Sequence, residues 1–389
     1  MKLVKLFSTQ SKINMVIDYI QILILVISSI SFANCFIVFL TWNIVKSEIN
    51  YSNEKISILI PARNEESKII KCISKCLNQS ERIEEIIVYD DNSDDNTFSI
   101  VKKLSNSNPI IKVIKGKILP QGWSGKNHAC FELSKLAKSK WLLFIDADTE
   151  LLPNSIPSLM KKTQDGFTFI SAWPKIQMKS FSEKLMMPLL NFVVFTFYPT
   201  LINKFSNKSS LGLAHGACIL VNKDIYNEIG GHSLVKEEIF EDTLLARKWR
   251  ESGYRSICIN GMNIIQVRMY ESLSEIWKGF EKNAFLAFKN PLNFFLFQIL
   301  HIFIFNLPVI LIPLTLFLYE KLFLTLISGI IILLIRLLLS IKFKHPIWSI
   351  FLHPIPEIFF TLLSFSAWIK FSFGNGITWK NRTYKKSNE

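Results

Sequence analysis

The chain has 389 residues, of which 49% are hydrophobic, and it carries a formal net charge of +14. Its mean hydropathy of +0.28 is too high for an ordinary soluble enzyme of this length. The basic residues form no concentrated stripe, which argues against nucleic acid as a partner and favours an anionic membrane surface and phosphate-bearing substrates.

Apolar runs at both ends of the chain are long enough to cross a membrane. The first covers 20–42, and three more lie within 294–371, each about 20 residues or longer. No small-residue cleavage site follows the first run, so we interpret it as a retained anchor and not as a signal peptide. The sequence therefore predicts a multi-pass protein of the cell membrane.

These runs divide the chain into three regions. We expect an N-terminal tail and anchor helix over 1–50, a water-facing domain over 51–290, and C-terminal membrane segments with a basic tail over 291–389. The basic tail favours the same side of the membrane as the domain. Pro354 and Pro356 break the last apolar run midway. We therefore expect that run to be re-entrant or interfacial, so that it returns the tail to the domain's side.

Strands and helices alternate in the central region. Apolar strands are predicted at 56–60, 85–89, 110–114 and 141–145, and helices at 65–77, 97–104 and 127–137. The strand ends recur about every 25–30 residues, which is the period of βα units. This pattern predicts an α/β fold with a parallel, doubly wound sheet.

Two carboxylates end the fourth predicted strand. Asp146 and Asp148 lie one residue apart, so the two-residue repeat of a strand places them on the same side. Mg²⁺ and Mn²⁺ take oxygen ligands and commonly share them between one or two carboxylates and a substrate's phosphates. An isolated pair of aspartates is also typical of a solvated turn. The polar residues at the neighbouring strand ends decide between a metal site and such a turn.

Polar residues also follow the first two strands. Pro61, Arg63 and Glu65 come after the first strand, and Asp91 comes after the second. In open α/β sheets, ligands bind outside the carboxyl ends of the strands. The three strand ends together predict a polar crevice for a nucleotide-type ligand.

Five motifs, in this order, resemble those of membrane-bound family-2 glycosyltransferases with the GT-A fold. They are 58–65 (ILIPARNE), 88–95 (VYDDNSDD), 122–126 (GWSGK), 146–148 (DAD) and 241–246 (EDTLLA). The form of 120–126 and the closing 379–384 (WKNRTY) resemble the branch that glycosylates carotenoid acids and hopanoid-like lipids. The resemblance covers about residues 55–290 and implies a Rossmann-like nucleotide-sugar domain between transmembrane helices.

The resemblance implies that the donor is a UDP-sugar. Glu65 and Asp91 would hydrogen-bond its uracil and ribose, since carboxylates accept from N–H and hydroxyl groups. Pro61 and Arg63 belong to the same donor-binding motif. Because UDP-sugars are cytosolic, the domain would be cytoplasmic.

The resemblance assigns the diphosphate and its metal to residues further along the chain. Asp148 would bind Mg²⁺ or Mn²⁺, and Asp146 would contact the ribose or the metal. Lys126 follows a Gly-rich turn at a predicted helix start, where a cation and free N–H groups could meet phosphate or sugar oxygens. Arg268 is a further diphosphate partner, because its fork matches phosphate oxygens.

The pair Glu241 and Asp242 supplies the catalytic residues in this interpretation. In the family the second acid is the general base that deprotonates the acceptor hydroxyl, and direct attack inverts the anomeric carbon. The alternative is that the pair caps the helix that follows. His215 also belongs to this half of the domain, as a site residue or as a hydrogen-bonded core histidine.

The segment 181–205 is rich in Phe, Leu and Met and is interrupted by two prolines. It is too broken for a clean span and predicts interfacial helices on the bilayer, although a pair of core helices would also fit. The interfacial reading places the acceptor, a membrane lipid, against the bilayer.

The sequence thus favours an inverting, metal-dependent hexosyltransferase that moves a sugar from a UDP-sugar to a carotenoid- or hopanoid-like lipid. One alternative is a processive polysaccharide synthase, which carries Gln-x-x-Arg-Trp where this chain has 266–270 (QVRMY). That departure weakens the case for a polymer-threading enzyme. The other alternative is a catalytically inactive partner subunit of a lipid-pathway complex.

Overall fold

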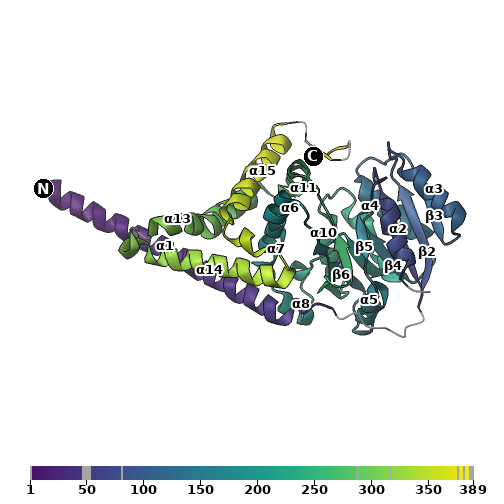
Figure 1. Cartoon of the computed structure of the whole chain (residues 1–389), viewed down its shortest axis with the longest axis horizontal. Coiled ribbons are helices and arrows are strands. Elements are labelled where there is room, and N and C mark those ends of the chain that lie inside the picture. The colour runs from purple at the N-terminus through teal and green to yellow at the C-terminus, as the bar shows by residue number, and fades with distance from the viewer. Residues whose placement is uncertain are drawn as a thin grey trace.

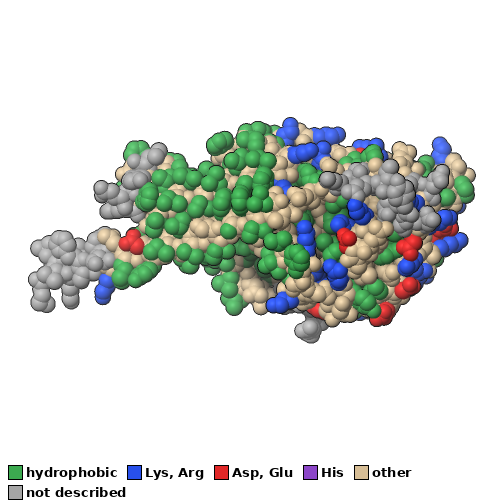
Figure 2. All heavy atoms as spheres, turned by 90° about the horizontal axis from the view of Figure 1, so that it is seen from below, with side chains coloured by type: hydrophobic (Ala, Val, Ile, Leu, Met, Phe, Trp, Pro, Cys, Tyr) green, Lys and Arg blue, Asp and Glu red, His purple; other side chains and the backbone are tan. Residues whose placement is uncertain are grey.

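The computed structural model describes residues 2–45, 54–79, 82–285, 288, 290–315, 317–374, 376–379 and 382–384. An α/β domain forms one end of an elongated molecule, and long helices extend from it toward the N-terminus at the opposite tip (Figure 1). Figure 2 shows hydrophobic side chains over the helical end and charged side chains over the domain. The expected boundary at residues 50 and 51 lies outside the described residues.

The domain is built on a seven-stranded sheet in the order β3-β2-β1-β4-β8-β6-β9. The strands are β1 Ile56–Ala62, β2 Ile83–Asp90, β3 Ile111–Lys115, β4 Trp141–Ile145, β6 Phe169–Trp173, β8 Cys218–Asn222 and β9 Ser256–Asn260. β1 to β4 are parallel, whereas β8 is antiparallel to β4 and β6. The four predicted strands and the mostly parallel sheet are confirmed.

Helices cover both faces of this sheet, because successive strand residues point to opposite sides. Ile58 and Leu143 pack on one face, and Leu59 and Leu142 pack on the other. The first face carries α2 Ile69–Leu77, α3 Thr97–Ser107 and α5 Ser155–Gln164; the second carries α4 Gly125–Leu136, α9 Lys223–Ile229 and α10 Glu241–Glu251. The sheet is thus the middle of three layers.

A second, three-stranded sheet has the order β5-β10-β7, formed by Thr149–Leu151, Ile265–Val267 and Lys175–Ile176. β10 is antiparallel to β5 and parallel to β7. Asp148 directly precedes β5 and Arg268 directly follows β10, so this small sheet fixes the positions of both.

Three helical stretches of the described residues are long and apolar enough to cross a membrane: Asn14–Thr41, Pro291–Thr315 and Leu322–Phe343. They lie in α1 Lys2–Thr41, in the consecutive α12 Pro291–Leu300, η3 His301–Asn306 and α13 Leu307–Thr315, and in α14 Tyr319–Phe343. The Thr325 hydroxyl donates to Gln21 Oε1 at 3.0 Å, and the Lys342 ammonium donates to the Phe39 carbonyl at 2.7 Å. α1 and α14 therefore lie side by side and run in the same direction.

The last apolar run forms α15 Pro354–Ser372, which is not one of these three stretches. It packs against α11 Leu273–Ala284, where Lys370 forms an ion pair with Glu281 at 2.8 Å. Its exposed apolar residues share one helix face: Ile355, Ile358, Leu362 and Ile369. Leu363 and Ala367 on its buried side are apolar too, so the interfacial position of α15 and the side of the membrane that the tail occupies stay predictions.

The segment 181–205 forms three short helices, α6 Phe181–Met186, α7 Pro188–Phe195 and α8 Thr200–Phe205. In α7, Phe192 and Phe195 are fully buried in a cluster with residues of α1 and α14. α7 is therefore a core helix between the domain and the long helices, as in the alternative weighed above. Phe181 and Phe205 are exposed, so interfacial contact by α6 and α8 stays a prediction.

The connection after α1 pairs with the edge strand of the large sheet. Ile44 forms a parallel bridge with Asn260, and the Val45 N–H donates to the Asn260 carbonyl at 3.0 Å. The Trp42 indole donates to the Cys258 carbonyl at 3.2 Å. These contacts tie the first long helix directly to β9.

Candidate active site

The carboxyl ends of β1, β2 and β4 lie together, because these strands are parallel neighbours in the sheet. The Asp91 N–H donates to the Ala62 carbonyl at 2.8 Å. The Arg63 guanidinium donates to the carbonyls of Asp91 and Asn92 at 2.6 and 2.8 Å. Arg63 thus fastens the two loops to each other, and any contact with a donor stays a prediction.

The other residues predicted to meet the nucleoside lie around this junction. Pro61 is half-buried near the end of β1, and Asp91 is buried at the end of β2. The Glu65 N–H donates to the Thr97 hydroxyl at 2.8 Å, which fixes the turn before α2. This turn explains why α2 begins at Ile69 and not at residue 65.

Lys126 joins acids from two distant parts of the chain. Its ammonium lies 2.8 Å from Asp146 Oδ1 and 2.9 Å from Glu241 Oε1. It stands in the first turn of α4, where the Ser124 hydroxyl caps the helix by accepting from the Asn127 N–H. A cation at the positive end of a helix is unfavourable by itself, so the two carboxylates balance it. The structure therefore brings together three of the predicted site residues.

Asp242 lies beside the same cluster. It accepts the Gly216 N–H at 2.8 Å and the Thr243 N–H at 2.6 Å. A Cβ on Gly216 would lie 2.7 Å from the Lys126 ammonium nitrogen, 3.5 Å from Asp146 Oδ2 and 3.6 Å from Asp242 Oδ2. The three side chains thus surround one glycine, whose lack of a side chain leaves room between them.

The electrostatics of this cluster separate its two aspartates. Burial raises the pKa of Asp146, but the charge and hydrogen bond of Lys126 outweigh it, so that pKa is lowered. Burial, together with the negative charge of Glu241, raises the pKa of Asp242 to about 7. Neighbouring acids whose pKa values are pushed apart are typical of a site that pairs a binding carboxylate with a proton acceptor.

The capping interpretation of Glu241 and Asp242 does not fit α10. The N-cap position is Phe240, and no side-chain hydrogen bond caps the helix. Both acids lie in the first helical turn, where the helix dipole favours negative charge. Glu241 is buried against Lys126, and Asp242 is half-buried.

His215 stands next to this loop. Burial lowers the pKa of its imidazole to about 4, so the ring is neutral at pH 7. Its N–H and carbonyl both bond the Ser171 hydroxyl, at 2.8 and 3.2 Å, and its ring packs edge-on against Trp173 at 5.1 Å. These contacts describe a hydrogen-bonded histidine that shapes the turn carrying Gly216.

Asp146 and Asp148, the predicted ligands of a divalent cation, follow β4 directly. Both are half-buried at the end of β4, and Lys68 lies 4.0 Å from Asp148 Oδ2. Among the described residues, no group of three or more His, Cys, Asp or Glu side chains could hold a metal alone. Two carboxylates suit Mg²⁺ or Mn²⁺ when a substrate's phosphates complete the coordination. Lys68 was not among the predicted site residues, because a single lysine after a turn carries no motif.

Arg268 has partners other than those predicted. Its guanidinium donates to Glu183 Oε1 at 2.8 Å and Oε2 at 3.2 Å, and it lies 3.0 Å from Glu271. Although burial raises the pKa of Glu183, the hydrogen bond from Arg268 lowers it to about 2. This forked pair joins β10 to α6, and the predicted contact with a diphosphate stays a prediction.

The arrangement of the sheet and of the strand-end acids defines a GT-A-like α/β fold. Residues 57–230 match the family described as Glycosyl transferase family 2. This match agrees with the resemblance of the motifs to family-2 glycosyltransferases.

Curated relatives and a solved structure agree with this assignment. The chain is 28% identical over 228 residues to the 4,4'-diaponeurosporenoate glycosyltransferase of Staphylococcus haemolyticus (strain JCSC1435), covering 57% of this chain and 58% of that protein. It is 27% identical over 241 residues to the enzyme of the same name from Staphylococcus aureus (strain USA300), and this match covers 59% of this chain and 61% of that protein. The match thus spans about three-fifths of these relatives.

Among solved structures, the fold is similar to that of the mannosyltransferase PcManGT from Pyrobaculum calidifontis, in complex with GDP-Man and Mn²⁺. The TM-score is 0.53 at 14% sequence identity, over 90% of this chain and 98% of that one. At this identity the likeness concerns the fold. The likeness covers more of the chain than the α/β domain alone.

Proposed function

We propose that the protein is an inverting glycosyltransferase that moves a sugar from a nucleotide diphosphate sugar to a hydroxyl or carboxyl group of a membrane lipid. The observation that carries this proposal is the placement of Asp242 beside the pair of Lys126 and Asp146 at the carboxyl edge of the sheet. In this proposal Asp242 is the proton acceptor and Lys126 is the phosphate-binding group, and both side chains lie next to Gly216. The curated relatives, named for a carotenoid acid, support a lipid of that kind as the acceptor.

The residues of the chain have separate tasks in this reaction. When the acceptor is a hydroxyl, Asp242 accepts its proton as the hydroxyl oxygen attacks the anomeric carbon, and the N–H groups of Gly216 and Thr243 orient the Asp242 carboxylate. A carboxyl acceptor is already ionised at neutral pH and attacks without a base. Lys126 and the first turn of α4 supply positive charge for the departing diphosphate. Asp146 and Asp148 would hold Mg²⁺ or Mn²⁺, which neutralises charge on the leaving nucleotide.

UDP-sugars remain the proposed donors, on the strength of the motifs after β1 and β2. Glu65 and Asp91 are at the ends of neighbouring strands, as uracil and ribose contacts require. GDP-mannose is the donor to test beside them, because the structural neighbour was solved with GDP-Man.

The test uses full-length protein in detergent with membrane lipid extract and Mn²⁺. UDP-glucose, UDP-N-acetylglucosamine and GDP-mannose are supplied in turn, and nucleotide diphosphate release and glycosylated lipid are measured. We expect one donor to give a singly glycosylated lipid. Asp242→Asn should keep donor binding and lose turnover by about 10²–10⁴-fold. Equal loss of binding and turnover would contradict the base role, and a polymeric product would favour a processive synthase.

A further inference from the structure

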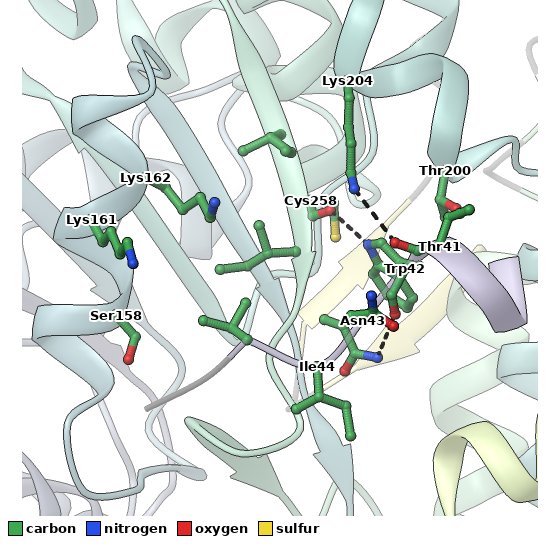
Figure 3. A pocket seen from close by; sticks show the side chains of 14 residues that line it. Thr41, Trp42, Asn43, Ile44, Ser158, Lys161, Lys162, Thr200, Lys204 and Cys258 are labelled. Carbon is green, nitrogen blue, oxygen red and sulfur yellow. Dashed lines mark hydrogen bonds between the residues drawn. The ribbon is translucent and has the colours of Figure 1, made fainter. Parts of the chain in front are cut away.

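A cavity of about 260 Å³ lies at the exit of the first long helix, away from the candidate active site (Figure 3). Four elements line it, namely the segment 41–45, α5, α8 and β9. It shares no residue with the cluster around Gly216. Pockets that enclose whole small ligands typically measure about 300–1,000 Å³. This cavity therefore suits a small polar group and not a complete nucleotide sugar or lipid.

The charged side chains that line this cavity are all basic. Lys161 and Lys162 come from the last turn of α5, and Lys204 comes from α8 on the other side (Figure 3). The lining residues that the structure describes include no Asp or Glu. Lys162 lies 2.8 Å from the exposed carboxylate of Asp165, and such surface pairs are weak enough for another anion to compete.

Neutral polar groups add to this basic lining. The Lys204 ammonium lies 3.5 Å from the Thr41 carbonyl, so it is held at the end of α1. Thr200 also lines the cavity and is 4% exposed. Within the described part of the chain its hydroxyl has no hydrogen-bond partner. A buried hydroxyl of this kind is a donor for an oxygen-rich ligand.

The cavity lies level with the ends of the candidate membrane spans that are nearest the α/β domain. The first candidate span ends at Thr41, which lines the cavity, and the last ends at Phe343. Lys342 reaches back to Phe39 at that level. On α8, Ile202 and Phe205 are 54% and 83% exposed, so the helix that lines the cavity with Thr200 and Lys204 carries exposed apolar side chains on its other faces. Exposed apolar residues next to lysines are typical of surfaces that meet lipid headgroups.

We propose that this cavity binds the phosphate of an anionic phospholipid headgroup and so anchors α5 and α8 to the membrane surface. Lys161, Lys162 and Lys204 supply the positive charge, and the Thr200 hydroxyl donates to a phosphate oxygen. The acyl chains would lie along Ile202 and Phe205. The site is separate from the proposed transfer reaction and does not depend on it.

The test measures lipid binding by the full-length protein in an uncharged detergent. Short-chain phosphatidylglycerol and phosphatidylcholine of equal chain length are titrated while the melting temperature is followed. We expect phosphatidylglycerol to raise the melting temperature more than phosphatidylcholine does. The variant K161Q/K162Q/K204Q should need at least about tenfold more phosphatidylglycerol for half of the effect, because each ammonium near the phosphate strengthens binding.

The control variant, K102Q/K103Q/K138Q, removes the same charge from lysines exposed elsewhere on the domain and should respond like wild type. K161R/K162R/K204R keeps the charge and should keep the response, which separates loss of charge from loss of structure. Equal responses of wild type and K161Q/K162Q/K204Q would overturn the proposal, as would an equal effect of the two lipids. An equal effect of inorganic phosphate would overturn the headgroup as its source.

Discussion

Asp242 accepts a hydrogen bond from the backbone N–H of Gly216 at 2.8 Å, across 26 residues of sequence. The bond joins the start of α10 to the turn before β8, and it holds the Asp242 carboxylate beside the glycine that Lys126 also approaches. A base held by a backbone donor keeps its orientation without a second side chain. The geometry of the proposed reaction therefore rests on a turn as much as on the acid.

We expect Gly216→Ala to lower turnover about 10–100-fold, since small misplacements at a reacting centre cost this much. The new methyl group would lie 2.7 Å from the Lys126 nitrogen, which must move away from Asp146 and Glu241. Steady-state kinetics and a melting curve check this. Ser210→Ala, an exposed change in the same half of the domain, is the control. Unchanged turnover would show that Lys126 can move without cost.

With a hydroxyl acceptor, activity should fall as the pH drops below about 7. The pKa of Asp242 is raised to about 7 by burial and by Glu241, so the carboxyl group is protonated below that pH and cannot accept a proton. Above it the carboxylate is charged and active. The pH dependence of kcat/KM with the best donor measures this. A profile that stays flat from pH 5 to 7 would exclude Asp242 as the base.

Lys126→Met should raise the pH at which activity is lost on the acidic side of the profile. The Lys126 charge opposes the rise in the pKa of Asp242, so its removal leaves the carboxylate among negative neighbours only. We expect Lys126→Arg to keep the wild-type limb, because it keeps the charge. If the Met variant loses activity without any shift of its limb, Lys126 acts on the donor alone.

Arg268→Gln separates a structural role from a diphosphate contact. Glu183 is fully buried, and removing its partner leaves an unpaired charge, which costs about 3 kcal/mol of unfolding free energy. We expect a lower melting temperature with little change in the donor KM. The double variant E183Q/R268Q should recover part of the stability. A raised donor KM at unchanged stability would instead support the diphosphate contact.

Labelling of single cysteines tests the topology. The six native cysteines are all buried, so a thiol reagent should label only the introduced, exposed cysteine. Ser372→Cys at the end of α15 should react on the same side as Ser107→Cys in the domain. Asn14→Cys, at the far end of the first candidate span, should react on the opposite side. Reaction of Ser372→Cys together with Asn14→Cys would mean that α15 crosses the membrane.

The sequence predicted the positions of the parallel strands well, because each of them is a buried apolar run followed by polar residues. β4 ends at Ile145 as the pattern predicts, whereas β1 continues two residues past its predicted end, to Ala62, and β2 one residue past its own, to Asp90. The antiparallel insertion of β8 between β4 and β6 carries no such signal, since β8 is a buried five-residue strand like β4 and its partners are distant in sequence.

Side-chain partners could not be predicted in the same way. Nothing local shows that Arg268 pairs with Glu183, which lies 85 residues earlier, or that Lys126 reaches Glu241. α7 was ambiguous for the same reason, because an apolar helix has one composition whether it faces lipid or packs between domain and membrane helices. Such pairings depend on tertiary contacts and not on periodicity.

The bridge between Ile44 and Asn260 makes the anchor part of the sheet. An edge strand with open N–H and C=O groups is a template for pairing with other chains, and the segment after α1 occupies such groups on β9. A shortened chain that begins within the domain would therefore lose more than its attachment to the bilayer. It would expose unpaired backbone groups on the edge strand β9. Aggregation of such a chain would therefore come from this exposed edge and not from misfolding of the catalytic domain.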